Sequence, residues 1–433
     1  MRGPLLRWLL VGVAVAAVTA VVVIVGLMLF GPRKPAPPVE VANAASSEEP
    51  RLPDGELPPE PTATPKTSRD YVILQIGDSH TAADLFSGEV RDQLQDKFGK
   101  GGLFLPPGIP KAGVQSADIT IKASDAWSYN AMASTDAPTS FWLSGYTASA
   151  SAYGASISFA SAAARGFDAI DVSFLKSPQG GTVDILLDGA VVNQVDLRGA
   201  AGEPLIRRLL PASGSVGKFK RLEVKTTSAG RVELSGVFVD QRQSGVSYLS
   251  VGFPSARVTI LERMAPENLA DDMQRIDPDM VVLAFGTNEG FDDNLDITAY
   301  RKTLTGIVTA LTRARPGLRI AIIGPPPGVR KEVSCAEVRR ACGSPPVAGS
   351  CWAEPPKLSA VRDVERVVAK ALGATYWDWS SVLPSACDLE QGHLGQPAIF
   401  GPDRVHLTPL GYRSSADAFA RMLTPIVSTA MGG

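Results

Sequence analysis

The sequence contains few of the residues that most often build metal sites and proton-transfer sites. Its 433 residues include only three histidines and four cysteines. No two cysteines form a CxxC pair and no histidines cluster beside them, which argues against zinc, and nothing implies an organic cofactor. Lys+Arg (42) and Asp+Glu (44) nearly cancel, giving a formal net charge of −2. The chain therefore lacks the basic surface of a dedicated nucleic-acid binder.

The four cysteines lie close together in the sequence. An even number of cysteines in one neighbourhood is typical of one or two disulfides, and disulfides persist outside the cytosol. The spacing does not define their connectivity, and four unrelated thiols are the alternative. The residues concerned are Cys335, Cys342, Cys351 and Cys387.

The first 34 residues predict a membrane anchor. Residues 8–30 carry no charge, and 23 residues in a helix span about 34 Å, enough to cross a bilayer. A cleaved signal peptide is the alternative, but its apolar core is usually shorter. Residues 35–67 are rich in Pro, Glu, Ala and Thr and cannot bury a core, which predicts an extended tether.

In the remaining chain the pattern of apolar residues changes twice, which predicts one domain inserted into another. Residues 68–107 begin with a buried strand at 71–76 and continue with a helical pattern to Phe98. Residues 108–245 show short alternating runs, with a hairpin signal at Asp188-Gly189, and predict a β-sandwich. Residues 246–433 return to α/β alternation, which predicts a parallel sheet with helices on both faces. The expected elements there are a strand at 279–285, a helix at 300–315, a strand at 318–323, a helix at 358–372, a strand at 374–377 and a helix at 410–423.

Three short motifs carry the candidate chemistry. They read Gly77-Asp78-Ser79-His80, Gly286-Thr287-Asn288-Glu289 and Asp403-Arg404-Val405-His406. The first two follow strands, and ligands bind at the carboxyl ends of strands in open α/β sheets. A serine hydroxyl is a weak nucleophile until a base removes its proton. Ser79 is the candidate nucleophile, His406 the base and Asp403 the residue that orients the base.

Other residues in these motifs have plainer interpretations. Read alone, Ser79 is a helix N-cap, which is the commonest role for serine at that place. We expect Asp78 to be a structural hydrogen-bonding residue and Glu289 a loop carboxylate. We assign no chemistry to His80, and we expect His393 to be exposed in a glycine-flanked loop.

The three motifs, in this order, resemble those of the SGNH/GDSL hydrolase superfamily. The resemblance covers residues 71–104 and 246 to the C-terminus, and it implies a three-layer, flavodoxin-like parallel-sheet domain. It also implies an oxyanion hole formed by the Ser79 N–H, the Asn288 amide and one N–H of the loop at 252–255. Gly252 matches the pattern in that loop, whereas Ser255 stands where the family usually has a second glycine. Either residue could be the donor.

The motifs around Ser79, the run Phe98-Gly99-Lys100-Gly101-Gly102 and the run Tyr376-Trp377-Asp378-Trp379 resemble a bacterial periplasmic branch of the superfamily. That branch includes peptidoglycan O-acetylesterases, some with a carbohydrate-binding β-sandwich in the slot that residues 108–245 occupy here. The resemblance implies an enzyme that removes O-acetyl groups from an envelope polysaccharide outside the cytoplasm, with peptidoglycan as the default. Together with the predicted anchor, this gives an expected location on the inner membrane with the body in the periplasm. A glycan O-acetyltransferase and a catalytically vestigial glycan-binding scaffold are the alternatives.

Overall fold

The computed structural model describes residues 70–107, 114–132, 142–211, 217–241, 245–264, 266–333, 342–343 and 349–432. The predicted anchor at 8–30 and the predicted tether at 35–67 lie outside these ranges. Within the ranges, no helix combines the length and the apolar character needed to cross a membrane.

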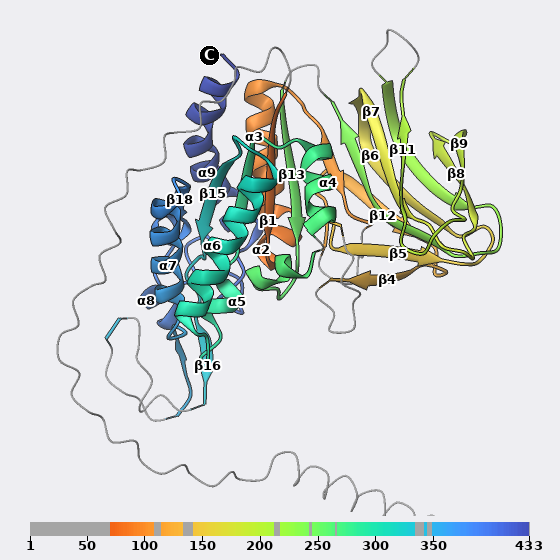
Figure 1. Cartoon of the computed structure of the whole chain (residues 1–433). Coiled ribbons are helices and arrows are strands. Elements are labelled where there is room, and N and C mark those ends of the chain that lie inside the picture. Colours follow the sequence, from red (N-terminus) through yellow and green to blue (C-terminus); the bar gives the residue numbers. More distant parts are fainter. Residues whose placement is uncertain are drawn as a thin grey trace, which may run out of the picture. The chain divides into compact units, whose positions relative to one another are not determined.

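A five-stranded parallel sheet forms the centre of the α/β domain (Figure 1). Its strand order is β13-β1-β14-β15-β18. Gly77 at the end of β1 pairs in register with Gly252 of β13 and Ala284 of β14. The loops that follow these three strands therefore leave the sheet at one edge, as the motif analysis predicted. The strands are Tyr71–Gly77 (β1), Val246–Gly252 (β13), Met280–Ala284 (β14), Arg319–Gly324 (β15) and Thr375–Asp378 (β18).

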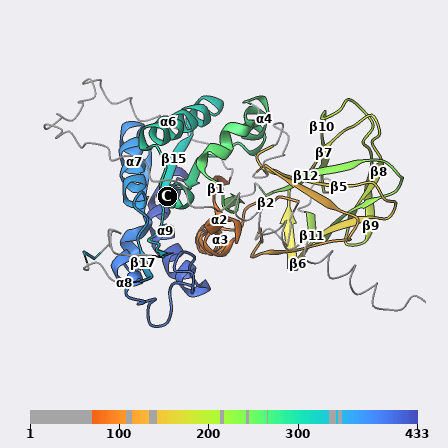
Figure 2. The same ribbon diagram turned by 90° about the horizontal axis from the view of Figure 1, so that it is seen from below.

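Helices cover both faces of this sheet, which confirms the predicted three layers. Tyr71 and Ile73 of β1 share a buried cluster with α3 (Leu85–Phe98) and α9 (Pro409–Ala430). The alternate β1 residues point the other way, since successive side chains on a strand face opposite sides. They pack with α4 (Pro266–Ile276), α6 (Ile297–Ala314) and α7 (Leu358–Ala371). Figure 2 shows α4 and α6 on one side of β1 and α3 on the other.

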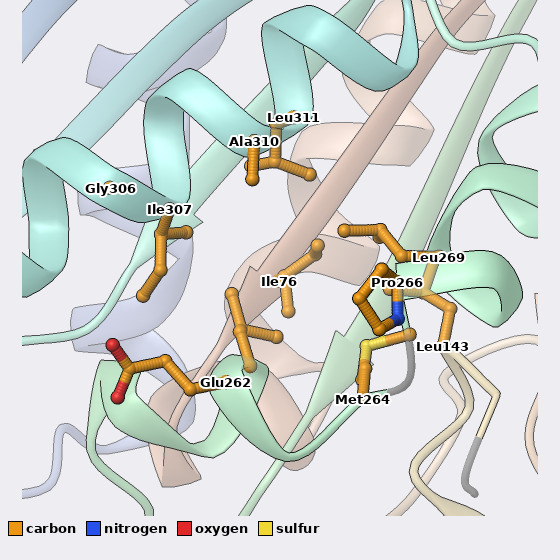
Figure 3. Close-up of a pocket in the computed structure, with 11 residues that line it drawn as sticks. Ile76, Leu143, Glu262, Met264, Pro266, Leu269, Gly306, Ile307, Ala310 and Leu311 are labelled. Carbon is orange, nitrogen blue, oxygen red and sulfur yellow. The ribbon is translucent and has the colours of Figure 1, made fainter.

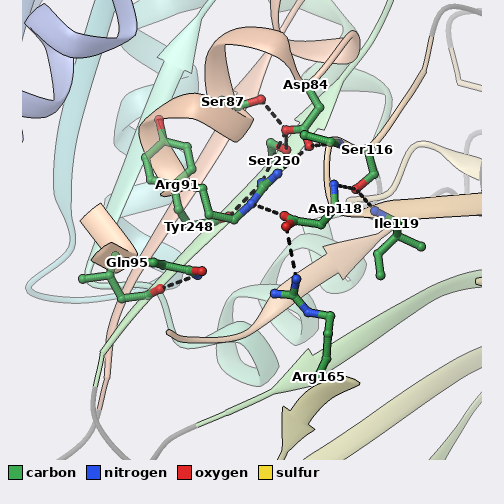
Figure 4. Close-up of polar contacts among 12 residues, drawn as sticks. Asp84, Ser87, Arg91, Gln95, Ser116, Asp118, Ile119, Arg165, Tyr248 and Ser250 are labelled. Carbon is green, nitrogen blue, oxygen red and sulfur yellow. Dashed lines mark hydrogen bonds and ion pairs between the residues drawn. The ribbon is translucent and has the colours of Figure 1, made fainter. Parts of the chain in front are cut away.

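The helical pattern after β1 forms two helices rather than the single helix that was predicted. A four-residue helix, α2 (Ser79–Ala82), precedes α3, and the break falls at Asp84, which has a left-handed φ of 51°. The carboxylate of Asp84 explains the break, because it is held by a buried ion pair with Arg91 and by the Ser250 hydroxyl (Figure 4). Hydrophobic periodicity continues across the break, so it could not reveal it.

Residues 103–240 contribute two antiparallel sheets. One has the order β10-β7-β12-β5-β4, with β2 paired to β12, and the other has the order β3-β6-β11-β8-β9. Both sheets contribute to one hydrophobic cluster. Asp188 and Gly189 both have positive φ and form the predicted two-residue hairpin turn between β8 and β9. The strands are Leu103–Leu105 (β2), Ile119–Ala123 (β3), Ser128–Ala131 (β4), Tyr146–Ala150 (β5), Ser156–Phe167 (β6), Ala169–Leu175 (β7), Thr182–Leu187 (β8), Ala190–Asp196 (β9), Pro204–Leu209 (β10), Gly217–Thr226 (β11) and Val232–Asp240 (β12).

An ion-paired cluster joins this antiparallel region to the α/β domain (Figure 4). Arg91 on α3 binds Asp118, which also pairs with Arg165 on β6. The side chain of Arg91 is only 4% exposed. Removing one partner of such a buried pair typically costs about 3–5 kcal/mol of stability, because the other charge is left uncompensated.

The cysteines differ in part from the disulfide prediction. Cys351 on β17 is in a disulfide, whose partner lies outside the described residues. Cys342 and Cys387 are not disulfide-bonded, so the structure has one of the one or two disulfides that were predicted. Hydrogen bonds hold them instead: Cys342 donates to the Glu390 carboxylate, and the Gln391 amide donates to Cys387. The remaining short elements are Thr287–Gly290 (α5), Ala386–Glu390 (α8), Arg330–Glu332 (β16), Cys351–Ala353 (β17) and the 3-10 helices Val258–Arg263 (η2) and Trp379–Val382 (η3).

Candidate active site

Ser79 lies at the first position of α2, directly after the end of β1. Asp78 caps this short helix, since its carboxylate accepts the N–H of His80 at 3.0 Å. Asp78 therefore has the structural role that the sequence suggested. Burial raises the pKa of Asp78 to about 7, although this N–H bond opposes the shift. The serine itself is partly exposed, so a substrate can reach its hydroxyl.

The structure brings together the three residues at the far ends of the domain. The Ser79 hydroxyl lies 2.9 Å from Nε2 of His406, and Nδ1 of His406 lies 2.7 Å from the Asp403 carboxylate. The same carboxylate accepts the N–H groups of Val405 and His406. Partial burial pushes the pKa of Asp403 upward, but these hydrogen bonds outweigh it and hold the pKa below its ordinary value. An ionised Asp403 favours the His406 tautomer that presents a bare Nε2 to the serine.

Asn288 lies on α5, which follows β14 at the same edge of the sheet as Ser79. Its side-chain amide nitrogen donates to the carbonyl of Ala256 at 2.8 Å. An amide nitrogen carries two hydrogens, so this contact fixes the group and leaves one hydrogen for a substrate oxygen. The contact also ties α5 to the loop after β13, which was predicted to supply another donor.

The two candidates in the loop after β13 have different surroundings. A Cβ on Gly252 would lie 2.1 Å from the Ala82 nitrogen, so glycine is needed there for close packing against α2. The carbonyl of Gly252 accepts the Tyr146 hydroxyl. Ser255 is exposed and has a left-handed φ of 60°, a conformation that glycine adopts without strain. The family glycine at this place thus has a conformational reason, and Ser255 takes the same conformation at a cost.

Glu289 has a larger structural role than the loop carboxylate that the sequence suggested. It is 1% exposed, and its two oxygens accept the N–H groups of Val258, at 2.6 Å, and Gly286, at 3.1 Å. Burial raises its pKa, against the effect of these bonds. Glu289 therefore joins the segment that carries Asn288 to the segment that carries Ala256. Its position after Asn288 gave no sign of the contact with Val258, which lies 31 residues earlier, whereas the contact with Gly286 is local.

His80 was given no role from the sequence, and the structure places it beneath the candidate base. Its side chain is 2% exposed, and its ring centroid lies 5.0 Å from that of His406. Its Nδ1 is 2.9 Å from the Tyr412 hydroxyl on α9. The third histidine, His393, is exposed, as expected. The spacing of 332 residues between His80 and Tyr412 hides this contact from any local pattern.

An apolar cavity of about 280 Å³ lies between η2, α4 and α6, and it is separate from this site (Figure 3). Ile76, Leu143, Met264 and Ile307 are among its walls, which include neither Ser79, His406 and Asp403 nor Asn288. In the part of the chain that the structure describes, no group of three or more His, Cys, Asp or Glu side chains could hold a metal ion. The geometry combines a candidate nucleophile, a candidate base, a carboxylate that can orient the base and an amide donor, which is the set that acyl transfer requires.

Comparisons with known proteins agree with this fold. Residues 234–414 match the model of the GDSL-like lipase/acylhydrolase family. A solved structure described as a peptidoglycan O-acetylesterase in action aligns over 83% of this chain and 92% of its own, with 23% identity and a TM-score of 0.66. Residues 234–414 are therefore similar to the GDSL-like lipase/acylhydrolase family, and the fold is similar to that of the solved esterase.

Other comparisons add less. A family two carbohydrate esterase from Clostridium thermocellum, in complex with cellohexaose, aligns over 70% of this chain and 99% of its own. Its identity is 13% and its TM-score is 0.31, too low to support an argument. A search of curated protein sequences gave no significant match.

Proposed function

We propose that this protein is a serine esterase that removes O-acetyl groups from an envelope polysaccharide, with peptidoglycan as the first candidate substrate. The observation that carries the proposal is the unbroken chain of contacts from Ser79 through His406 to Asp403, at 2.9 and 2.7 Å. A serine, a histidine and a carboxylate in this order form the arrangement that activates a serine for attack on an ester.

In the proposed reaction the Ser79 oxygen attacks the carbonyl carbon of the acetyl ester while His406 takes the serine proton. The ester C–O bond then breaks, and His406 returns the proton to the departing sugar oxygen. Asp403 holds the imidazole and stabilises its transient positive charge. Water then attacks the acetyl-enzyme with His406 again as the base, which releases acetate and restores Ser79.

Three donors are proposed to hold the oxyanion that forms at each attack: the Ser79 N–H, the second amide hydrogen of Asn288 and the N–H of Ser255. Gly252 is the weaker candidate, because it is packed beneath α2, whereas Ser255 is exposed beside Ala256, which anchors Asn288. Loss of one such donor typically costs about 3 kcal/mol of transition-state stabilisation.

The exposure of the base favours hydrolysis over acetyl transfer to a second sugar. The side chain of His406 is 47% exposed and that of Asp403 is 52% exposed. Water can therefore approach the base without displacing a protein group. A transferase needs to keep water from the acetyl-enzyme, typically by closing the site.

The polysaccharide substrate and the location are further parts of the proposal. The solved structure with a TM-score of 0.66 is described as a peptidoglycan O-acetylesterase, and it covers most of both chains. We propose that residues 108–245 are a β-sandwich that contacts glycan, which their two antiparallel sheets support. We also propose that residues 8–30 anchor the body on the periplasmic side of the inner membrane, since they carry no charge and one cysteine of the body is in a disulfide.

Trapping the acetyl-enzyme tests the mechanism. Protein mixed with p-nitrophenyl acetate and quenched in acid should carry one acetyl group on the peptide that contains Ser79, and Ser79→Ala should carry none. Adding an unacetylated glycan should leave the ratio of acetate to p-nitrophenol at one. Acetyl groups that appear on the glycan would show a transferase instead, and labelling that persists in Ser79→Ala would refute the nucleophile.

A further inference from the structure

The candidate base is held at its edges but has little protein around it. His406 contacts Ser79 through Nε2 and Asp403 through Nδ1, and about half of its side chain is exposed. Two edge contacts leave the ring able to rock out of the plane that meets the serine. The face of the ring is supported by His80, at a centroid distance of 5.0 Å and an interplanar angle of 39°.

His80 is itself fixed on several sides. Its backbone N–H donates to the Asp78 carboxylate at 3.0 Å, and its ring Nδ1 lies 2.9 Å from the Tyr412 hydroxyl. The indole of Trp379 meets the imidazole edge-on at 5.4 Å. These contacts come from the turn between β1 and α2, from α9 and from η3. His80 therefore lies where three separate parts of the domain meet.

Tyr412 connects His80 to the backbone beside the base. Its ring belongs to the same buried cluster as Leu407, the residue that follows His406. Its hydroxyl can donate a hydrogen to Nδ1 of His80, 2.9 Å away. Tyr412 thus connects the helix that carries Ser79 with the cluster that packs the segment after His406.

The other ring nitrogen of His80 argues that the residue is not kept for stability. Its Nε2 is buried and has no hydrogen-bond partner in the described ranges. Burying an unpaired polar atom costs stability, and a phenylalanine of similar shape would avoid that cost. A histidine here is explained if its Nδ1 contact with Tyr412 is needed.

His80 also stays uncharged while the base changes its charge. Burial, together with the neighbouring His406, lowers the pKa of His80 to about 3, and Asp403 opposes this only in part. The titratable groups around it are His406, Asp403, Tyr412 and Asp78. A neutral neighbour does not oppose the positive charge that forms on His406 during attack.

We propose that His80 is a positioning residue: with Tyr412, it holds the His406 imidazole and its backbone in the orientation that meets Ser79. The inference rests on the proposed catalytic role of His406. It predicts an effect on turnover rather than on substrate binding, because His80 is buried beneath the base and out of reach of substrate.

The test is a double-mutant cycle on the contact between the two rings. His80→Phe and Tyr412→Phe each remove one end of the Nδ1–hydroxyl bond and keep an aromatic ring. With p-nitrophenyl acetate, each should lower kcat about 10-fold with KM within about twofold, because a small misplacement of a catalytic group is costly. The double variant should lose no more than either single variant, since both break the same contact. His393→Phe, a change at the exposed histidine, should leave kcat unchanged.

A spectroscopic measurement separates positioning from a general loss of structure. The low-field proton signal of the His406–Asp403 hydrogen bond should broaden or disappear in Tyr412→Phe, which removes one oxygen, at a temperature where the variant remains folded. Additive losses in the double variant, kcat within twofold of the parent, or an unchanged low-field signal would overturn the inference. If the parent protein is inactive, or Ser79→Ala is as active as the parent, the proposed function fails instead.

Discussion

Replacing Glu289 by glutamine should weaken both the fold and the reaction, because this carboxylate organises the candidate oxyanion loop. Its two oxygens accept two buried N–H groups, those of Val258 and Gly286. A glutamine has one oxygen, so one of these N–H groups is left facing an NH₂ group. An unsatisfied buried donor costs about 1–3 kcal/mol. A domain of ordinary stability, about 5–15 kcal/mol, remains folded after that loss.

The effect on activity follows from the neighbours of Glu289. Asn288 precedes it, and Ala256, which holds the Asn288 amide, lies two residues before Val258. Movement of this loop displaces oxyanion donors, and complete loss of one donor would cost about 3 kcal/mol. Glu289→Gln should therefore lower kcat between about 10-fold and 10²-fold. This loss does not exceed the effect of removing one oxyanion donor completely.

Urea unfolding and the hydrolysis of p-nitrophenyl acetate together measure both effects. Glu262→Gln is the matched control, because Glu262 is exposed on η2 in the same part of the domain and should tolerate the same chemical change. If Glu289→Gln unfolds at the parent's urea midpoint and turns over at the parent's rate, the organising role is refuted. Equal losses of stability and turnover in Glu289→Gln and Glu262→Gln would also refute the organising role of Glu289.

Three further predictions follow from the site. Asp403→Asn should lower kcat at least about 10²-fold with little change in stability, since the residue orients His406 but is half exposed; an unchanged rate in steady-state kinetics would leave a serine–histidine pair as the active unit. The pKa of Asp78 is raised to about 7 in the fold, so its contribution to stability is full below its ordinary value of 3.8 and is lost as pH rises through about 7. The unfolding free energy of the parent relative to Asp78→Asn should accordingly fall between pH 4 and pH 7, and a constant difference would exclude the buried acid. Ser255→Gly should raise the unfolding free energy by up to about 1 kcal/mol and keep activity, because it relieves a φ of 60° while retaining the N–H; a lower melting temperature would show that the serine side chain is needed.

The sequence was sufficient where the signal is periodic or ordered along the chain. The strands β1 and β14 and the helices α6 and α7 follow from apolar runs and helical spacing, and they appear within three residues of the predicted bounds. The final helix, α9, was also predicted, but it continues to Ala430 rather than ending at residue 423. The placement of Ser79 and Asn288 at one edge follows from the rule that parallel strands end together, and the order of the motifs along the chain indicated His406 as the base. These inferences need only local pattern and topology.

The sequence was insufficient where a side chain acts across a long chain separation. The break between α2 and α3 depends on the contacts of Asp84 with Arg91 and Ser250, the latter 166 residues away. The bridge made by Glu289 and the contact of His80 with Tyr412 have the same character. No periodicity reports such pairs, because each partner in isolation resembles an ordinary polar residue of a loop or helix.

The cysteines show a different limit. Their grouping along the chain predicted disulfides, but proximity in sequence does not provide the geometry that a sulfur–sulfur bond needs. Cys351 is in a disulfide, whereas Cys342 and Cys387 are not disulfide-bonded. Only the folded arrangement distinguishes these cases.

Release of acetate from O-acetylated polysaccharides is the most direct measurement of the proposed esterase activity. Purified protein, its Ser79→Ala variant and the His393→Phe control would be incubated with O-acetylated peptidoglycan and with other O-acetylated glycans, and free acetate would be quantified. We expect release by the parent and by His393→Phe from at least one of these glycans, and none above background by Ser79→Ala. Release that is indifferent to Ser79, or no release from any O-acetylated glycan by a folded parent, would contradict it.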